Sequence, residues 1–436
     1  MDEPEENSEE KLAAIRVNGG SKIFHWMTSL FMLMIIPSFG ACFAIANRYT
    51  TAIFIQLVSA IYACFEAIFL RFPDPAGHEN RTSRGTAWFV AFFFCFTLFL
   101  GSVAAGSSLL LTSEQVHRFK FIGHSVASIG YKICSGIIVF VGFLKAGMSI
   151  VALLGFCYDD HTGQCNAHGI MGSAFVLYGF YMAVMLVVPW LRMNNGKYSP
   201  EFYDSMVIML WGIVNTFTEH RPWEPWSHGD YQHTSMGIIF WACGALGLYM
   251  SRNRKRNYMP ALTLILTGYA MSEHVQHLIV STKVHGFFGE VLIIGGVVRI
   301  VEISFLLNDE EYSKSGGIYS FQYLPSFALV LSGLLFMGAN EEQLQLVVNM
   351  GADHSSYILV ISSCACFMQL WFLVIINFYL KLVGTSSSGV NKYGLLPSDD
   401  LESTVADTNN RHQTDDIDQF ELDDMSDFGE STRHNP

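Results

Sequence analysis

Long apolar runs recur along the whole chain, and they restrict it to one class of fold. Eleven such runs cover residues 24–46, 50–71, 86–111, 121–156, 167–191, 202–220, 233–251, 259–277, 285–307, 320–339 and 356–383. A helix needs about 20 apolar residues to cross a bilayer, and it satisfies its own backbone hydrogen bonds in lipid. The sequence therefore predicts an all-α polytopic membrane protein with about eleven transmembrane helices, four N-terminal ones and a seven-helix C-terminal core.

The composition supports this class. Of the 436 residues, 51% are hydrophobic and only 14% are charged, whereas a soluble domain carries about 25% charged residues. The formal net charge of −13 lies mainly in the N-terminal MDEPEENSEE and in the tail after Leu396, so it does not indicate a nucleic-acid partner. The sequence contains no P-loop, Rossmann fingerprint or nucleophile elbow.

These patterns divide the chain into four parts. They are a disordered acidic N-tail (1–23), a four-span membrane region (24–157), a seven-span core (158–384) and a disordered acidic cytosolic tail (385–436). The run 121–156 is too long for one straight crossing. Its glycines allow a kink, or a crossing near 121–145 that an interfacial piece follows. An error in the count at this run would invert every later span.

Loop charges predict the orientation. The cluster Arg252, Arg254, Lys255 and Arg256 follows the seventh run, and most other basic loop residues fall on the same side. The positive-inside rule places that side and the C-terminal tail in the cytosol and the N-terminus in the lumen or outside the cell. Asn80 opens a glycosylation sequon on the outer side, which agrees with this orientation.

Two further patterns concern the compartment. Cys157 and Cys165 flank the short loop CYDDHTGQC, where a disulfide is expected if the loop is exoplasmic and two free thiols otherwise. The stretch Tyr393-Gly394-Leu395-Leu396 has the pattern of a tyrosine-based sorting motif. It favours endosomal, lysosomal or plasma membrane over the endoplasmic reticulum.

Histidines and acidic residues lie where the apolar runs of the C-terminal core begin and end. In the predicted topology they all fall at the outer membrane face. Imidazoles from four or five helix ends suit Zn²⁺, which takes three or four N/O ligands at about 2.0–2.2 Å, and nearby carboxylates can bind the ion or fix a histidine tautomer. Imidazole at a helix end can also simply satisfy backbone groups. The candidate metal ligands are His168, His220, His233, His274, His277, His285, Glu219 and Glu273.

Charged residues also occur inside the apolar runs. Arg299 and Glu302 lie in the ninth run, where charges are costly and usually functional. Their spacing of three residues also allows a purely structural ion pair. Glu66 and Lys132 are charges in the N-terminal half, and we expect that they pair with each other.

Several sequence motifs resemble known membrane protein families. The stretch His168-GIMGSAFVLYGFY begins a resemblance to the transmembrane protein 45 family over about 168–384, and that family's pattern corresponds here to His168, Glu219-His220 (or His233), His274–His277, His285 and Glu302. The fuller pattern WGIVNTFTEHRPWEPW…HTSMGIIFWACGALGLYMSR resembles the fungal Ytp-type membrane proteins, whose additional N-terminal region is similar to 24–157. The transmembrane protein 45 pattern has a His in its last span, where this chain has Met368 and Gln369. These resemblances imply a fold and a site, but they do not indicate a biochemical activity.

The sequence leaves several functions open. The leading hypothesis is a metal-binding membrane protein in transport, sensing or scaffolding, with a metal ion and membrane lipid as partners and no protein partner indicated. A zinc-dependent intramembrane lipid hydrolase is the alternative, with Glu219 or Glu273 as general base. Whether the protein is an enzyme is therefore undecided.

Haem and copper are cofactors that the sequence favours less than zinc. The opening HWMTSLFMLMIIPSFG resembles the first core helix of the ascorbate-reducing cytochrome b family, but His25, His117 and His124 have no clear partners for bis-histidine haem ligation. Cys364-x-Cys366-x-Met368 offers soft ligands for Cu(I).

Overall fold

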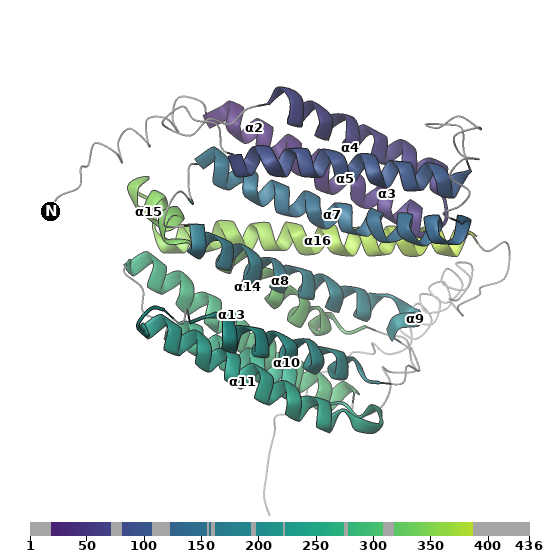
Figure 1. The fold of residues 1–436 in the computed structure, drawn as a ribbon. Coiled ribbons are helices and arrows are strands. Elements are labelled where there is room, and N and C mark those ends of the chain that lie inside the picture. The colour runs from purple at the N-terminus through teal and green to yellow at the C-terminus, as the bar shows by residue number, and fades with distance from the viewer. Residues whose placement is uncertain are drawn as a thin grey trace, which may run out of the picture. The chain divides into compact units, whose positions relative to one another are not determined.

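The computed structural model describes residues 19–70, 81–106, 123–154, 157, 162–192, 198–220, 223–273, 278–307 and 318–386. In these residues the secondary structure is helical and no strand occurs (Figure 1). The chain divides into two units, Met1–Val383 and Gly384–Pro436, and the arrangement below is that of the first. The all-α class predicted from the sequence is confirmed.

The N-terminal helices form one bundle. They are α2 (Gly19–Leu30), which continues through the π-helical η1 (Phe31–Ile35) into α3 (Ile36–Ile45), then α4 (Tyr49–Phe69), α5 (Arg81–Ala105) and α7 (His124–Leu154). Alanines, Ile53, Phe94, Tyr131 and Ile138 fill its core. The long fourth run folds as one helix, α7, without the break that an interfacial piece after residue 145 requires.

The C-terminal helices form the larger part of the structure. They are α8 (Thr162–Val187), α9 (Pro189–Arg192), α10 (Pro200–Thr218), α11 (His228–Met250), η4 (Arg252–Arg254), α12 (Met259–Ser272), α13 (Ile279–Val301), η5 (Glu302–Leu307), η6 (Ser320–Tyr323), α14 (Leu324–Met337), α15 (Glu341–Asn349) and α16 (His354–Ser386). Phe288, Leu292, Leu329 and Leu335 lie in their main apolar core.

Helix α16 connects the two groups of helices (Figure 1). On one side Phe378 packs edge-on against Phe39 of α3, with ring centroids 5.1 Å apart. On the other side Phe372 packs against Phe180 of α8, with centroids 4.8 Å apart. The last helix thus holds the N-terminal bundle against the core.

Each predicted span coincides with a helix, but the helices are not equally suited to crossing a membrane. Within the described part of the chain, seven helices are long and apolar enough, and they include Ile23–Ile45, Ser83–Ala105, Gly163–Val187 and His354–Gly384. Charged residues or histidines interrupt α10, α11 and α13, and α12 has only 14 residues. A helix of that length rises about 21 Å. The class of multi-pass membrane protein is clear, and eleven crossings remain a prediction.

Helices α8 and α14 touch along their backbones. A Cβ atom at Gly333 would lie 2.5 Å from the carbonyl oxygen of Gly172, and one at Gly179 would lie 2.9 Å from that of Ser326. Only glycine permits such contact, and small residues at this spacing are typical of close helix packing in membranes. The Ser326 hydroxyl also donates to the carbonyl of Gly179 at 2.8 Å.

A buried ion pair lies inside the N-terminal bundle. Lys145 of α7 lies 3.1 Å from the Glu66 carboxylate of α4, and their side chains are 1% and 2% exposed. The expected pairing of Glu66 with Lys132 is therefore wrong. Lys132 is 13 residues before Lys145, which turns it by roughly 220° to another face of the same helix. We refer to Glu66 and Lys145 as the N-terminal pair.

Candidate functional site

Antiparallel helices gather the polar residues of the core at two opposite ends. One end contains the beginnings of α8, α11 and α13 and the end of α10, and we name it the histidine end, after His168, His220, His233 and His285. The other end contains the beginnings of α10 and α12 and the end of α13. We name it the charged end, after Glu201, Arg256, Arg299 and Glu302.

His168 and His285 form a pair at the histidine end. Their ring centroids lie 6.0 Å apart with the rings nearly perpendicular, although α8 and α13 are far apart in sequence. His168 also stacks on Phe336 of α14, with centroids 4.6 Å apart. The tight α8–α14 contact explains this position, because it holds the start of α8 against the end of α14.

Each imidazole of this pair is fixed through the same nitrogen. His168 Nδ1 lies 2.8 Å from the carbonyl oxygen of Gln164, and His285 Nδ1 lies 2.9 Å from that of Ser281. A carbonyl oxygen can only accept, so each Nδ1 carries the proton and each neutral ring keeps its lone pair on Nε2. Nε2 of His168 is buried and has no hydrogen-bond partner in the described part of the chain.

Two other candidate histidines of this end contact carboxylates. His233 Nδ1 lies 3.3 Å from Glu219, and both side chains are partly exposed. His220 stacks on Trp226, with centroids 4.1 Å apart, and its Nδ1 lies 3.4 Å from Asp230. His220 is thus directed to a helix cap instead of to His168.

The capping box that holds Asp230 begins α11. Ser227 accepts from the Asp230 backbone N–H at 3.1 Å, and Asp230 accepts from the Ser227 backbone N–H at 2.9 Å. This backbone hydrogen bond lowers the pKa of Asp230 below its ordinary value, and the neighbouring His220 adds to the effect. Asp230 was not among the candidate metal ligands, although S-x-x-D before an apolar run is a typical helix start.

Other predicted residues are exposed or lie outside the described part of the chain. Glu273 is exposed at the C-terminal end of α12. His274, His277 and the sequon residue Asn80 lie outside the described residues. Among those that are described, Cys157, Cys165 and Glu342 are the one group whose possible metal-binding atoms all lie within 4.8 Å of one another. The four candidate histidines that the structure describes therefore form a pair and two carboxylate contacts, and not a complete set of metal ligands.

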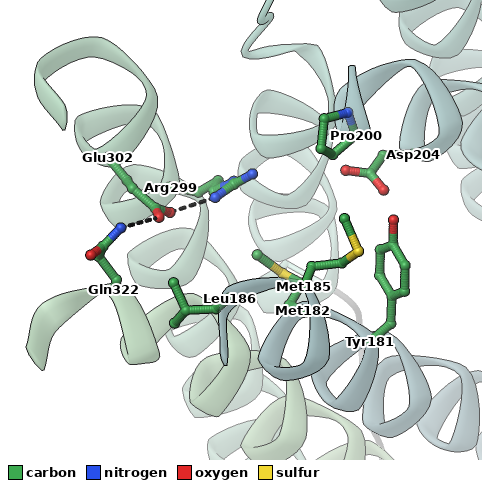
Figure 2. Close-up of a pocket in the computed structure, with 9 residues that line it drawn as sticks. All are labelled: Tyr181, Met182, Met185, Leu186, Pro200, Asp204, Arg299, Glu302 and Gln322. Carbon is green, nitrogen blue, oxygen red and sulfur yellow. Dashed lines mark hydrogen bonds and ion pairs between the residues drawn. The ribbon is translucent and has the colours of Figure 1, made fainter. Parts of the chain in front are cut away.

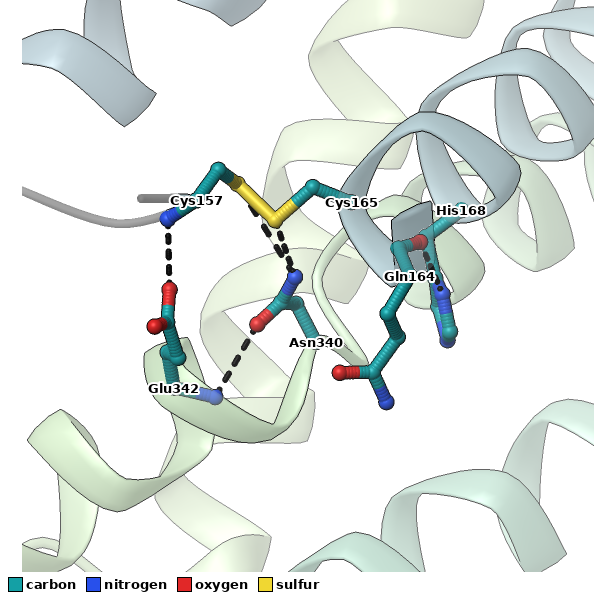
Figure 3. The surroundings of a disulfide bond; sticks show 6 residues. All are labelled: Cys157, Gln164, Cys165, His168, Asn340 and Glu342. Atoms are coloured by element: carbon teal, nitrogen blue, oxygen red, sulfur yellow. Dashed lines mark hydrogen bonds between the residues drawn. A yellow bond between two sulfur atoms is a disulfide. The ribbon is translucent and has the colours of Figure 1, made fainter. Parts of the chain in front are cut away.

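A disulfide joins Cys157 and Cys165 at the same end (Figure 3). The backbone N–H of Cys157 donates to Glu342 of α15, and the Asn340 side chain contacts Cys165. Figure 3 shows that His168 lies one turn beyond Cys165 on α8. The disulfide thus ties the connection between α7 and α8 to the start of α15, next to the histidine pair.

The charged end contains a continuous ion network. Arg299 bridges two carboxylates, with Nη1 2.5 Å from Glu302 and Nη2 2.9 Å from Glu201. Arg256 reaches the same Glu201 oxygen at 2.8 Å. Gln322 donates to the other oxygen of Glu302 at 3.1 Å. The sequence suggested the Arg299–Glu302 contact, but it did not indicate Glu201, Arg256 or Gln322 as members of a network.

Two small cavities adjoin this network, and Asp204 and Arg299 line both of them. Each has a volume of about 20 Å³, enough for one water molecule. In the first cavity Tyr181 points its hydroxyl toward the Asp204 carboxylate (Figure 2). Tyr178 and Glu201 line the second. The second carboxylate oxygen of Glu201, which is 1% exposed, is buried without a hydrogen-bond partner among the described residues.

The residues that suggested other cofactors lie apart. Trp26, next to His25, donates to the carbonyl of Ala146 at 3.2 Å, so His25 lies beside the C-terminal part of α7. His124 begins α7, about 33 Å away along the helix, so these two cannot bind one haem; His117 lies outside the described residues. Cys364 and Cys366 are free and exposed.

The last helix supplies an amide where the transmembrane protein 45 pattern has a histidine. Gln369 is buried and donates to Ser326 of α14 at 3.1 Å. Met368 packs at the edge of the main core. Gln369 therefore contacts the place where α8 and α14 pack together, and it makes no described contact with His168 or His285.

The length, apolar composition and alternating direction of these helices define an α-helical multi-pass membrane protein. The family model described as "Protein YTP1-like, C-terminal" matches residues 141–380. Protein YTP1 of Saccharomyces cerevisiae is 51% identical over 376 residues, which cover 86% of this chain and 81% of that protein. The chain belongs to this family of fungal Ytp1-like membrane proteins.

More distant relatives are also membrane proteins by name. The "Uncharacterized membrane protein C3B8.06" of Schizosaccharomyces pombe is 25% identical over 257 residues, which cover 48% of this chain and 50% of that protein. The "Uncharacterized membrane protein YCR061W" of Saccharomyces cerevisiae is 27% identical over 175 residues, 34% of this chain and 28% of that protein. No solved structure matches the chain.

Proposed function

We propose that this membrane protein binds a transition-metal ion, preferably zinc, at its histidine end and serves metal transport, sensing or scaffolding. One observation carries the proposal. The buried Nε2 atom of His168 has no described hydrogen-bond partner, and the imidazole of His285 stands 6.0 Å away, centroid to centroid. A buried polar atom without a partner costs free energy, and a metal ion would remove that cost.

The fixed tautomers support this assignment. Histidines that bind metal usually donate the other ring N–H to a carbonyl or carboxylate, which orients the ring. His168 and His285 both donate in this way to a backbone carbonyl one turn earlier. They would supply two of the three or four ligands that zinc requires.

The remaining ligands would come from neighbouring helix ends. Helix α12 packs against α13 with backbone contact, since a Cβ atom at Gly268 would lie 2.5 Å from the carbonyl oxygen of Gly289. Its C-cap residue, Glu273, is followed in sequence by His274 and, three residues later, by His277. His233, held by Glu219, is a further candidate. Imidazole and carboxylate donors suit zinc, and the disulfide leaves Cys157 and Cys165 without a thiolate for Cu(I).

We also propose that the histidine end faces the lumen or the cell exterior. The basic cluster Arg252–Arg256 follows α11 at the charged end, and the positive-inside rule assigns that end to the cytosol. A disulfide between Cys157 and Cys165 at the histidine end agrees with an oxidising compartment. The tyrosine-based motif in the C-terminal tail would direct the protein to endosomal, lysosomal or plasma membrane.

The first test is elemental analysis of detergent-purified protein. Wild type is expected to contain about one zinc per chain, and a His168→Ala/His285→Ala variant is expected to lose it. A His274→Ala/His277→Ala variant tests the end of α12 in the same way. His354→Ala is the matched control, because His354 begins α16 and takes no part in the pair, so its zinc content should equal that of wild type.

Two results would contradict the proposal. One is wild-type protein without a transition metal after purification in the presence of zinc. The other is an unchanged metal content in the His168→Ala/His285→Ala variant. Non-reducing gel mobility, which reports the Cys157–Cys165 bond, would verify that each variant still folds around its disulfide.

A further inference from the structure

Among its described residues, the charged end has more acidic than basic groups. Its described members are three carboxylates (Glu201, Asp204 and Glu302) and two guanidinium groups (Arg256 and Arg299). Arginine does not lose its proton in proteins, so full ionisation of the carboxylates would leave one surplus negative charge among them. An unpaired charge is expensive to keep away from water, and a carboxylate can escape that cost by taking up a proton.

The hydrogen bonds distinguish the three carboxylates. One oxygen of Glu201 accepts from both arginines, and Glu302 accepts from Arg299 and from Gln322. Asp204 makes no ion pair with either arginine within 4 Å. The Tyr181 hydroxyl points toward it (Figure 2), and the Tyr178 side chain is a further hydrogen-bonding neighbour. A hydroxyl both donates and accepts, so it can serve a neutral or an ionised carboxyl group.

The spacing along α10 adds a second reason. Asp204 follows Glu201 by three residues, and residues at this spacing are neighbours on one helix face. Each carboxylate therefore disfavours the charged form of the other. Arg256 and Arg299 already bind Glu201 and stabilise its charged form. Asp204 is therefore the carboxyl group that we expect to be neutral.

The cavities provide room for an exchangeable proton and its carrier. Asp204 lines both, and each holds about one water molecule in its 20 Å³. Glu201 lines the second cavity, and its other oxygen is buried without a described partner. A water molecule there could bridge Asp204 and Glu201. A hydrated metal cation would require more space and would have to lie beside the Arg299 guanidinium.

We propose that the charged end is a proton-binding site in which Asp204 carries one exchangeable proton and shares it with Glu201 across the water-sized cavities. Hydronium gives its proton to the Asp204 carboxylate and leaves as water, and deprotonation reverses this step. The groups that face Asp204 are Glu201 on α10, Arg256 before α12, Arg299 and Glu302 at the end of α13, and Tyr178 and Tyr181 on α8. The site is independent of the proposed metal, because it lies at the opposite end of the core.

The test is infrared spectroscopy of metal-free, chelator-treated protein in lipid nanodiscs, titrated with acid and base. A protonated buried carboxyl group gives a carbonyl stretching band apart from that of carboxylates. We expect this band in wild type, its shift on labelling with ¹³C-aspartate, and its loss in Asp204→Asn. The control is Asp353→Asn at the exposed start of α16, which should leave the band unchanged.

A second variant keeps the proposal falsifiable if Asp204→Asn does not fold. Glu201→Gln removes the negative neighbour of Asp204, so the band should persist and its titration midpoint should move to lower pH. A band that does not shift with ¹³C-aspartate, that survives Asp204→Asn, or that keeps its midpoint in Glu201→Gln would overturn the proposal. So would the absence of any titrating carboxyl band. Because the protein is free of metal, these outcomes do not depend on the zinc content of the histidine end.

Discussion

The N-terminal pair and the charged end are both buried ion clusters in apolar helices, but their charges balance differently. In the N-terminal pair one lysine meets one carboxylate, and the side chains of Lys145 and Glu66 are 1% and 2% exposed. Lys145 also donates to the carbonyl of Ser83 at 3.3 Å, and Ser29 donates to Glu66 at 3.4 Å. At the charged end three carboxylates accompany two arginines beside two cavities, and only Glu201 and Glu302 form ion pairs with the arginines.

This difference separates a structural role from a chemical one. In the one-to-one pair the two charges balance and additional hydrogen bonds hold both side chains, so the pair fixes α4 and α7 in one arrangement. A network with one carboxylate more than its arginines can change its charge by one proton without the loss of an ion pair. Buried charge alone therefore does not indicate function, and the balance of charges is the more informative property.

The largest expected effect is on the N-terminal pair. Lys145→Met leaves the Glu66 carboxylate buried without its partner, and such a change typically destabilises a protein by about 3–5 kcal/mol. The measurement is the free energy of unfolding in mixed micelles. The double variant Lys145→Met/Glu66→Leu should recover most of the loss, because both charges are then absent. A double variant as unstable as the single one would show that packing, and not charge, holds this site.

Arg299→Gln should have a smaller effect, about 2–3 kcal/mol, because hydrogen bonds to charged groups are worth about 1.5–3 kcal/mol each and Arg256 still binds Glu201. The loss of stability should be smaller at acidic pH. Without Arg299 the cluster has a larger excess of acidic groups, and negative charge that is buried without a partner is costly.

Unfolding of the Arg299→Gln variant at several pH values checks this expectation. Arg252→Gln is the matched control, because Arg252 is exposed and lies over the ring of Tyr249, 4.4 Å from its centroid. Its unfolding free energy should stay near that of wild type and follow the same pH dependence. An Arg299→Gln variant that becomes more stable as pH rises would contradict the reasoning.

Gln322→Leu should cost about 1–2 kcal/mol, the usual penalty for a buried acceptor that loses its donor. Gln322 donates to Glu302 and accepts from the Tyr319 backbone N–H at 2.8 Å. The equivalent change in the other cluster is Ser29→Ala, which removes the hydroxyl that links Tyr62 to Glu66. Similar losses for both variants would show that hydrogen bonds from uncharged donors to these carboxylates contribute equally, so that only the charge balance distinguishes the two clusters.

The smallest expected effect is that of Asp204→Asn. An amide replaces a neutral carboxyl group at equal size, and the stability near neutral pH should change by less than about 1.5 kcal/mol. Glu66→Gln, the same kind of substitution, leaves Lys145 without a countercharge and should destabilise several times more. Equal losses in the two variants would remove the distinction between the clusters.

The sequence predicted those features that depend on local pattern. Apolar runs located the long helices, because a bilayer requires such runs wherever a chain crosses it, but they did not indicate α15, which lies between two runs. Arg299 and Glu302 could be paired in advance, because a spacing of three residues makes neighbours on a helix. Glu201 could not be assigned to them, since it follows Pro200 at the start of an apolar run and is 98 positions from Arg299.

The predicted pairing of Glu66 with Lys132 was wrong for a similar reason, because it also depends on how helices pack. Lys132 and Lys145 lie on one long helix, and only the way α7 packs against α4 decides which of them faces Glu66. For the histidines, the spacing indicated that the helix ends meet, but not which rings meet. His168 faces His285, while His220 faces Asp230, and this choice depends on how the helices rotate about their axes.

The contact between α8 and α14 also limits how this molecule can move. Because Gly172 and Gly333 approach within a distance that excludes any Cβ atom, the two helices cannot slide past each other without driving a larger side chain into a backbone. They must move as one rigid body. This body contains His168 at one end and Tyr178 and Tyr181 at the other, so a tilt of the pair would alter the histidine end and the charged end together. Motion that opens one end must occur along the contacts of this pair with α10–α13.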